Sequence, residues 1–334
     1  PGDYARELVD DVGYFYTQGM PEDTAALSSG VFNDDQFRTQ ASQVLDERLR
    51  FLRHELNRYQ DGFLYFYFST LDLNSHAFWR YLDPGHPMHN PEMLDQHGDF
   101  LPELYRRIDE GIGWALEVAD ENTLLAVVSD HGFASFRRQV QLNSWLLENG
   151  FASLHPGAER GTTSYFVDTD WTDTQAYGVG INSLYINRKG REPEGTVSDG
   201  NDYEDLRTRL INQLLAMRDP ETGTAPIHRV LRREALYSGP YLERAPDLVV
   251  LYNEQYRASW DTILGAYPHG ILSDNLDPWS GDHCMDSIFL PGVMICNRKI
   301  SMPDPALEDF APTILSLCKL DVPTEMTGRN LGVR

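Results

Sequence analysis

The sequence predicts an α/β protein in which a mostly parallel sheet is sandwiched by helices. Amphipathic helices alternate with short apolar runs, and a helix–strand–helix–strand order is typical of parallel α/β folds. Two of the apolar runs are followed directly by Asp and His. After Gly150 the chain becomes rich in turns and short strand-like stretches. With 334 residues, the chain is long enough for one large domain or two modest ones.

The first third of the chain predicts a long helix and then a strand. The helix is expected from about residue 34 to 59, with Asn33 as its N-cap and Gln36 three residues on. Its apolar side chains recur at helical spacing: Val44, Leu45, Leu49, Leu52 and Leu56. The aromatic-rich run from Phe63 to Phe68 then indicates a buried strand.

The same order is repeated further along the chain. A second amphipathic helix is predicted over residues 101–119, and a second buried strand from Leu124 to Val128. Residues 141–148 can begin another helix, and residues 309–317 form a closing one. These elements favour a single α/β core built from both ends of the chain.

The stretch after Gly150 differs from the rest of the chain in its sequence pattern. Short runs such as Ser183 to Asn187 are typical of a small antiparallel system. We therefore predict an α/β core of residues 1–150 and 246–334. Residues 151–245 are interpreted as an inserted, β-rich subdomain that serves as a cap or contacts the substrate.

The composition excludes several classes of protein. The formal net charge is −23, so the chain lacks the basic surface that binding to nucleic acid or to an anionic membrane requires. Hydrophobic residues make up 41% and aromatic residues 11%, which is enough for a sizeable core. A phosphate ester would be repelled by the whole molecule, so its attraction would have to be local and come from metal ions.

The cysteines and the chain start bear on the compartment. The three cysteines rule out a disulfide framework. Cys296 and Cys318 are predicted to be buried thiols, and Cys284 beside His283 could be a thiolate ligand.

No signal peptide or membrane span is visible, but the start lacks Met and looks cut from something longer. A cytoplasmic location is favoured over a periplasmic or secreted one, and the sequence does not predict the oligomeric state.

Three loops carry residues suited to metal binding. Asp72 and His76 follow the first predicted strand, and Asp130 and His131 follow the second. The carboxyl ends of parallel strands are where open α/β sheets place their ligands. His283 in a later Gly-Asp-His loop completes the set. Asp72, His76 and His283 can fill one site, and Asp130 and His131 can begin a second, with Zn²⁺ favoured, Mn²⁺ or iron possible and Ca²⁺ disfavoured.

Each motif also has an ordinary structural explanation. Asp72 can be a helix N-cap with His76 on the face of that helix. An Asp-His-Gly tripeptide can lie in a turn, and His283 can be a solvated loop residue. The combination is more specific than any one motif, because two motifs follow predicted strands and the third supplies a further ligand.

The order Asp-x-x-x-His, Ser-Asp-His-Gly and Gly-Asp-His resembles the alkaline phosphatase superfamily. It is closest to the type I phosphodiesterase/nucleotide pyrophosphatase branch and its predicted phosphohydrolase and phosphomutase relatives. Further similarity lies in residues 66–69, 77–79, 245–250, 311–315 and 320–329. The resemblance spans most of residues 63–331 and implies an alkaline phosphatase-like sheet. It also implies two divalent metal ions, one held by Asp72, His76 and His283 and the other by Asp130 and His131.

The resemblance further implies an acidic ligand and a Thr or Ser nucleophile N-terminal to these motifs. No strand with such residues is predicted before residue 63. Thr24, Ser28 and Ser29 lie in a polar stretch and are poor candidates for a nucleophile. We therefore expect this chain to be the C-terminal portion of a longer protein, with the nucleophile upstream of residue 1 and the second metal site incomplete here.

The function that follows is a metal-dependent hydrolase of phosphate mono- or diesters, acting on a small phosphorylated substrate through a phosphoenzyme. A phosphomutase on the same fold is the first alternative, and an inactive metal-binding or scaffold module is the second. Sulfatase chemistry is disfavoured because its Cys/Ser-x-Pro-x-Arg motif is missing. Arg80, His86 and Asn182 are weaker candidates for substrate contacts.

Overall fold

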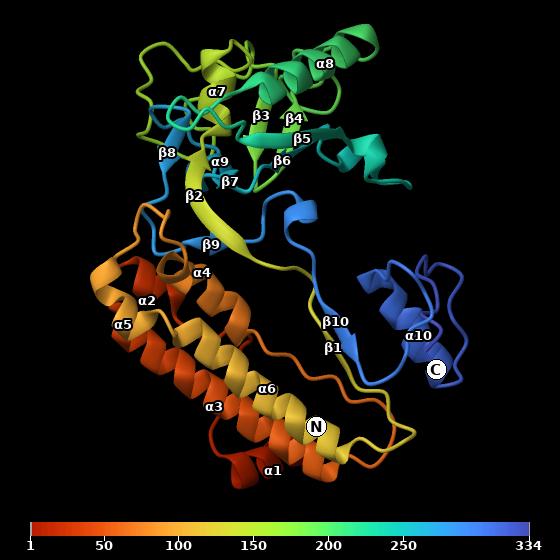
Figure 1. Ribbon diagram of the computed structural model, residues 1–334. Helices are drawn as coiled ribbons and strands as arrows, with labels where there is room; N and C mark the ends of the chain where they lie inside the picture. The colour runs from red at the N-terminus through yellow and green to blue at the C-terminus, as the bar shows by residue number, and fades with distance from the viewer. Residues whose placement is uncertain (1, 334) are drawn as a thin grey trace. The chain divides into compact units, whose positions relative to one another are not determined.

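A computed structural model describes residues 2–333, which form two compact units (Figure 1). The first unit contains the chain up to Phe78, Met93–Gly132 and the part from Pro291 onward. The second contains Trp79–Glu92 and Phe133–Leu290. Helices and several sheets together make a mixed α/β protein, as the sequence predicts. Each unit is described by itself below.

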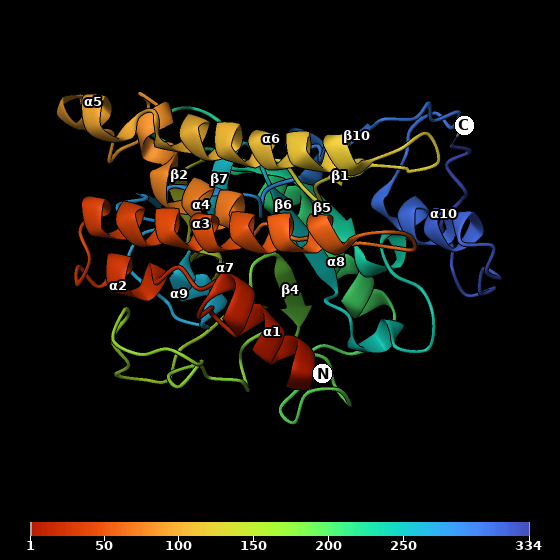
Figure 2. The same ribbon diagram turned by 90° about the horizontal axis from the view of Figure 1, so that it is seen from below.

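The first unit is built around two long helices, α3 (Asp34–Arg58) and α6 (Phe100–Val118). They contact each other along their apolar faces (Figures 1 and 2). A Cβ added at Gly111 of α6 would lie 3.1 Å from methyl groups of Leu49 and Leu52, so a small residue suits this close approach. Both helices were predicted from their periodicity, and both predictions are confirmed.

Local sequence fixes where α3 begins. The Asn33 side chain accepts the Gln36 backbone N–H at 2.9 Å, and the Gln36 side chain accepts the Asn33 N–H at 3.0 Å. This reciprocal pair satisfies backbone donors that a helix start otherwise leaves without partners. The other helices that lie wholly in this unit are shorter: α1 (Gly2–Val12), α2 (Thr24–Ser28), α5 (Leu94–His97) and α10 (Phe310–Leu317). The predicted closing helix is thus confirmed as α10.

The run from Phe63 to Phe68 is not the buried strand that its composition predicted. It belongs to no strand, and Phe63, Tyr65 and Tyr67 are exposed. Phe66 and Phe68 alternate with them and are half-buried. The side-chain alternation of an extended chain is therefore present, but no neighbouring strand among residues 2–333 pairs with this segment.

The two strands of the first unit are β1 (Ala126–Val128) and β10 (Met294–Cys296). They pair antiparallel, with Ala126 opposite Cys296. β1 confirms the second predicted strand but corrects its burial, because Ala126 and Val127 are half-buried and Val128 is exposed. A two-stranded ribbon has too few neighbours to cover both of its faces.

The second unit contains a four-stranded antiparallel sheet in the order β3–β4–β6–β5. Its strands are β3 (Ala176–Val179), β4 (Ser183–Ile186), β5 (Ile227–Arg232) and β6 (Leu248–Tyr252). Helices α7 (Leu142–Glu148) and α8 (Asn201–Ala216) pack on it and share its large apolar core. The antiparallel system expected after Gly150 is therefore present, although its strands extend to Tyr252.

A second sheet in the same unit has β2 (Ala134–Val140) at its centre. Its neighbours are β7 (Gln255–Ala258), β8 (Leu272–Asp274) and β9 (Gly281–Asp282), followed by the short helix α9 (Trp260–Ile263) on the β7 side. β2 and β7 run parallel, whereas all other pairs of the labelled strands are antiparallel. The described residues thus do not confirm a mostly parallel sheet, because strands that follow helices in sequence pair with later return strands instead.

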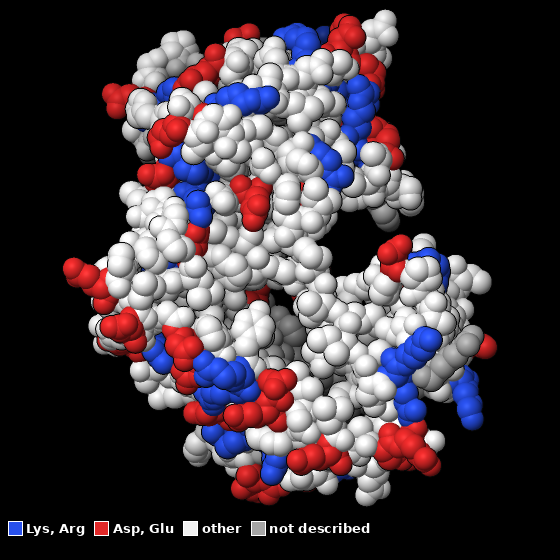
Figure 3. Space-filling view, in the orientation of Figure 1, with Lys and Arg blue, Asp and Glu red and all other residues white. Residues whose placement is uncertain are grey.

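Short 3₁₀ turns connect several of these elements. Single 3₁₀ turns occur at Pro91–Met93, Arg233–Ala235, Leu242–Arg244, Ser287–Phe289 and Leu307–Asp309. Acidic and basic side chains are interspersed over the face seen in Figure 3. None of the helices within residues 2–333 combines the length and the apolar character needed to cross a membrane.

All three cysteines are free thiols. Cys284 and Cys296 are partly buried, and Cys318 is exposed, so the predicted burial of Cys318 is wrong. Cys318 follows the last residue of α10, and its backbone N–H bonds back to Ile314 as the helix ends. At that position the side chain is outside the packed face of the helix.

Candidate active site

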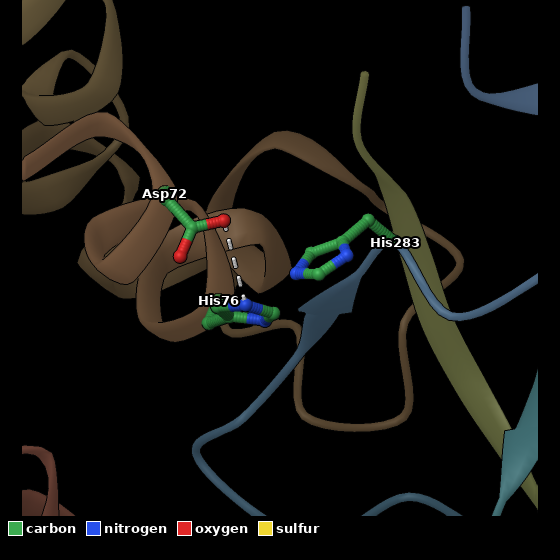
Figure 4. Close-up of side chains that lie close together, drawn as sticks. All are labelled: Asp72, His76 and His283. Carbon is green, nitrogen blue, oxygen red and sulfur yellow. Dashed lines mark ion pairs between the residues drawn. The ribbon is translucent and has the colours of Figure 1, made fainter. Parts of the chain in front are cut away.

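Asp72 and His76 lie on α4 (Thr70–Leu82), the helix that follows the extended aromatic segment. Residues four apart lie on the same helix face, one turn above each other. The Asp72 Oδ1 atom is 3.8 Å from the His76 Nε2 atom, and the His76 side chain is only 3% exposed (Figure 4). α4 thus presents a carboxylate and a buried imidazole together. The two residues lie on a helix and not in the loop that the sequence predicted.

Asp130 and His131 follow β1 and reach the same carboxylate. The His131 Nε2 atom is 3.7 Å from Asp72 Oδ1 and 3.6 Å from Asp130 Oδ1. Asp72, His76, Asp130 and His131 therefore form one group within the first unit, here called the ligand cluster. The two motifs, 58 residues apart in the sequence from Asp72 to Asp130, meet because the residues that follow β1 lie beside the first turn of α4.

The loop before Asp130 is tied to β10. The Ser129 N–H donates to the Val293 carbonyl at 3.0 Å, and the Val293 N–H donates to the Ser129 hydroxyl at 2.9 Å. A Cβ at Gly292 would lie 2.5 Å from the Ser129 carbonyl oxygen, so only glycine fits this close approach. The position of Asp130 and His131 thus depends on a glycine from the far end of the chain.

The geometry of the ligand cluster suits a divalent metal. The Nδ1 atom of His131 lies 2.9 Å from the Gly132 carbonyl, which can only accept a hydrogen bond, so Nδ1 is the donor there and Nε2 is the nitrogen that could bind a metal. Two ligands each about 2.1 Å from a tetrahedral zinc would be roughly 3.4 Å apart. The oxygen–nitrogen separations of 3.6, 3.7 and 3.8 Å are within a few tenths of that value.

The surroundings of the cluster are strongly acidic. Burial raises the pKa of Tyr67, and the charges of Asp72 and Asp130 raise it further. A phenol titrates later when nearby negative charge opposes its ionisation. The same field stabilises a bound cation and agrees with the expectation that positive charge at this site comes from metal.

Glu22 is a residue near this cluster that the sequence did not single out. It is 4% exposed, and neither carboxylate oxygen has a hydrogen-bond partner of normal geometry within the described chain. Burial raises the pKa of Glu22, the nearby Thr70 hydroxyl and Arg48 lower it, and the charge of Asp72 raises it. A buried carboxylate without partners is costly and calls for an explanation such as a bound ion or water.

The loop that holds Glu22 is fixed from α3. The Gln40 side chain accepts the Asp23 N–H at 2.8 Å and donates to the Pro21 carbonyl at 3.2 Å. Asp23 also caps α2 by accepting the Ala26 N–H at 2.8 Å. Because both neighbours of Glu22 are held in this way, its side chain turns inward. In the sequence, Glu22 looks like any exposed acidic residue before a helix, so no signal there could have found it.

His283 follows β9 in the second unit, and Figure 4 draws it beyond the end of that strand. Potential ligand atoms of Asp282, His283 and Cys284 lie within 4.8 Å of one another. Asp282 is already engaged in several hydrogen bonds. Burial raises the pKa of the Cys284 thiol to about 12, with Asp282 adding to the shift, so the thiol stays protonated near neutral pH. The roles of His283 and Cys284 as metal ligands stay predictions.

The weaker substrate candidates make structural contacts in the second unit. His86 is buried, its Nε2 lies 2.9 Å from the Phe136 carbonyl, and its Nδ1 accepts the Met88 N–H at 3.0 Å. Burial is the main cause that lowers the pKa of His86, so it stays neutral. With both ring nitrogens engaged, His86 is suited to holding its loop.

Arg80 and Asn182 bond to the segment that carries His283. The Arg80 guanidinium donates to the Pro278 carbonyl at 3.2 Å. The Asn182 amide donates to the Val250 carbonyl at 2.6 Å and to the Cys284 carbonyl at 3.3 Å. Direct substrate contacts by these residues stay predictions.

A third acidic group lies away from the ligand cluster. Glu7, Asp11 and His54 join α1 to α3, with His54 Nδ1 at 3.6 Å from Asp11 Oδ2. Glu7 is already paired with Arg58. This competing cation makes the group a poor metal site.

An α/β protein with clustered Asp and His side chains beside a strand end has the composition of a metal-assisted phosphoester hydrolase site. The profile of the family described as type I phosphodiesterase / nucleotide pyrophosphatase matches residues 10–265, and the chain belongs to this family. Its members fall within the alkaline phosphatase superfamily and act on small phosphorylated substrates. No match was found among curated proteins. The ligand cluster lies inside the matched range, and His283 lies beyond it.

Proposed function

We propose that this protein is a metal-dependent phosphoric ester hydrolase of the phosphodiesterase type that uses two divalent ions. The observation that carries this proposal is the Asp72 carboxylate, which lies 3.8 Å from the His76 Nε2 atom and 3.7 Å from the His131 Nε2 atom. Membership of a phosphodiesterase and pyrophosphatase family supports the reaction class. One carboxylate between two imidazoles is an arrangement suited to neighbouring metals.

We propose the following ligands for the two ions. Asp72, His76 and His283 hold one ion, and Asp130 and His131 contribute to the other. Carboxylate oxygen and imidazole nitrogen favour Zn²⁺ first and Mn²⁺ second.

The chain's own groups prepare this site for catalysis. When bound, the metals would polarise phosphoryl oxygens and stabilise the attacking and leaving oxygens of an in-line displacement. The Gly132 carbonyl fixes the His131 tautomer, and burial of His76 keeps water away from its ring. We propose a phosphoenzyme on a Thr or Ser outside residues 1–334. Thr24 and Ser28 lie within α2, and the Ser29 hydroxyl donates to the Ala25 carbonyl at 2.7 Å, which supports leaving them unassigned.

The finer architecture is also proposed rather than observed. We propose an alkaline phosphatase-like core of residues 1–150 and 246–334, into which residues 151–245 are inserted to select the substrate. The antiparallel strands β3 and β4 and helix α8 fall in this insertion and support a separate role for it.

The test is metal content with activity. The chain is reconstituted with Zn²⁺ or Mn²⁺, freed of excess ion and analysed for metal per chain, and hydrolysis of a chromogenic phosphodiester is measured in parallel. His76→Ala is expected to lose at least one ion, while His155→Ala, which alters an exposed histidine, keeps the metal content. Full metal retention in His76→Ala would overturn the ligand assignment.

A further inference from the structure

The segment from Pro278 to Cys284, here called the His283 loop, is held from several directions within the second unit. The Arg80 backbone N–H donates to the Ser280 hydroxyl at 3.1 Å. The Asn275 amide donates to the Trp279 carbonyl at 2.8 Å. β9, which lies within this loop, pairs with β2. A loop anchored in this way can hold a side chain in one direction.

Asp282 is the centre of these contacts. Its Oδ1 accepts the backbone N–H groups of His283 at 2.7 Å and of Cys284 at 2.8 Å. Its Oδ2 accepts the Trp279 indole N–H at 2.9 Å and lies 3.0 Å from the Arg257 Nε atom. The two backbone bonds flank the His283 Cα atom, so the Asp282 carboxylate sets the direction in which His283 leaves the chain.

Arg257 in turn fixes Asp282. It comes from β7, and its side chain is 2% exposed while that of Asp282 is 1% exposed. The guanidinium lies 4.3 Å from the Trp260 ring centre and 5.1 Å from that of Phe136. Two rings and a buried carboxylate leave this guanidinium little freedom.

The imidazole itself is oriented by an aromatic neighbour. The Phe133 ring lies 5.5 Å from the His283 ring at an angle of 64°. Asp282 is unsuited to being a ligand in its own right, because its oxygens already accept the donors named above.

We propose that Asp282 and Arg257 are positioning residues that hold His283 in the orientation needed to bind a divalent metal. This inference rests on the proposed function, which assigns His283 as a ligand. Partners that orient a ligating histidine commonly matter about 10- to 100-fold for metal affinity. Asp282 would orient His283 through its hydrogen bonds to the loop backbone and not through a bond to the imidazole.

The experiment compares Zn²⁺ affinity, measured by competition with a chelator, in Asp282→Asn, Arg257→Met and His283→Ala. The first two variants are expected to lose about 10- to 100-fold in affinity. In Co²⁺-loaded protein, the visible absorption bands of Asp282→Asn should change, because the bands report ligand geometry. Trp279→Phe removes only the indole N–H donor to Asp282, so its Zn²⁺ affinity should fall by only a few-fold. This milder variant keeps the test usable if Asp282→Asn fails to fold.

A matched control separates positioning from general loss of structure. Arg138 is buried in the same unit and pairs with Asp219 at 3.0 Å. Its other ion pairs are with Glu221 and Asp274, outside the His283 loop. Arg138→Met should therefore lower the unfolding temperature while leaving Zn²⁺ affinity and the Co²⁺ spectrum unchanged.

The outcomes are distinguishable. Normal Zn²⁺ affinity and an unchanged Co²⁺ spectrum in Asp282→Asn, with metal lost in His283→Ala, would overturn this inference and leave the proposed function standing. Unchanged affinity in His283→Ala would overturn the ligand assignment and the inference with it. Equal effects of Arg138→Met and Arg257→Met on the metal would show that the role is structural and also overturn the inference.

Discussion

Buried charges are treated differently in the two units. In the second unit, the fully buried carboxylates of Asp219, Asp247 and Asp286 each bond to an arginine. In the first unit, the fully buried Asp309 is also paired with an arginine, Arg329. Glu22 is nearly as buried, yet its side-chain oxygens have no hydrogen-bond partner of normal geometry within the described residues. The three buried carboxylates of the second unit are therefore paired with arginine, whereas Glu22 of the first unit carries its charge close to the predicted metal ligand Asp72.

The difference has a physical meaning. A buried ion pair contributes little net stability, but removal of one partner leaves an uncompensated charge and is costly. Buried carboxylates without partners favour binding of a cation instead. We therefore expect the second unit to be sensitive to loss of arginines and the first to respond to metal and to loss of carboxylates.

The largest effect is expected for Arg138→Met in the second unit. Arg138 bonds to the buried Asp219 and to Glu221 and Asp274, so its loss leaves the Asp219 carboxylate buried without a cationic partner. The free energy of unfolding should fall by about 3–5 kcal/mol, as measured by urea denaturation. Arg106→Met, which alters an exposed pair with Asp99, serves as the control and should change it by less than about 1 kcal/mol. A loss in Arg138→Met no larger than in this control would contradict the comparison.

An intermediate, pH-dependent effect is expected from Asp286. Burial alone would raise its pKa, but hydrogen bonds from Arg229 and His228 outweigh burial and hold the pKa at about 2. Because the folded pKa is below the unfolded one, this stability is present above about pH 4 and is lost as pH falls towards 2. The loss should be about 1–2 kcal/mol, after allowance for the exposed Arg229.

The check for Asp286 is denaturation at several pH values. Asp286→Asn should be less stable than the wild type at pH 6, and the difference should shrink as pH approaches 2. A difference that stays constant between pH 6 and pH 2 would show that ionisation of Asp286 does not stabilise this unit.

The smallest effect is expected for Glu22→Gln in the first unit, measured in metal-free protein. Burial raises the pKa of Glu22, so the ionised form opposes folding, and stability falls as pH rises from the unfolded pKa through the folded one. Removal of the charge should therefore stabilise the chain by about 1 kcal/mol at neutral pH, with the gain vanishing in acid. Asp23→Asn, which keeps an N-cap residue, is the control. Destabilisation by Glu22→Gln at neutral pH would break the comparison.

The helices and the sheet show where sequence reasoning succeeds. α3, α6 and α10 were predicted because apolar spacing and capping residues act within one helix. The segment from Phe63 to Phe68 was predicted wrongly because burial of a strand depends on neighbours from elsewhere in the chain. The prediction of a mostly parallel sheet failed for the same reason, because β1 pairs antiparallel with β10, which lies far along the sequence.

By itself, the sequence determined the long helices α3 and α6, the mixed α/β class and the residue types of the predicted ligand motifs, because these depend on residue type and short spacing. Only the tertiary structure brought His131 beside Asp72 and placed Glu22 in a buried position. It also paired Asp282 with Arg257. Those arrangements join residues distant in sequence, and burial of a charge is set by all the elements around it. An acidic residue therefore looks the same in the sequence whether it is solvated, paired or turned towards a metal site.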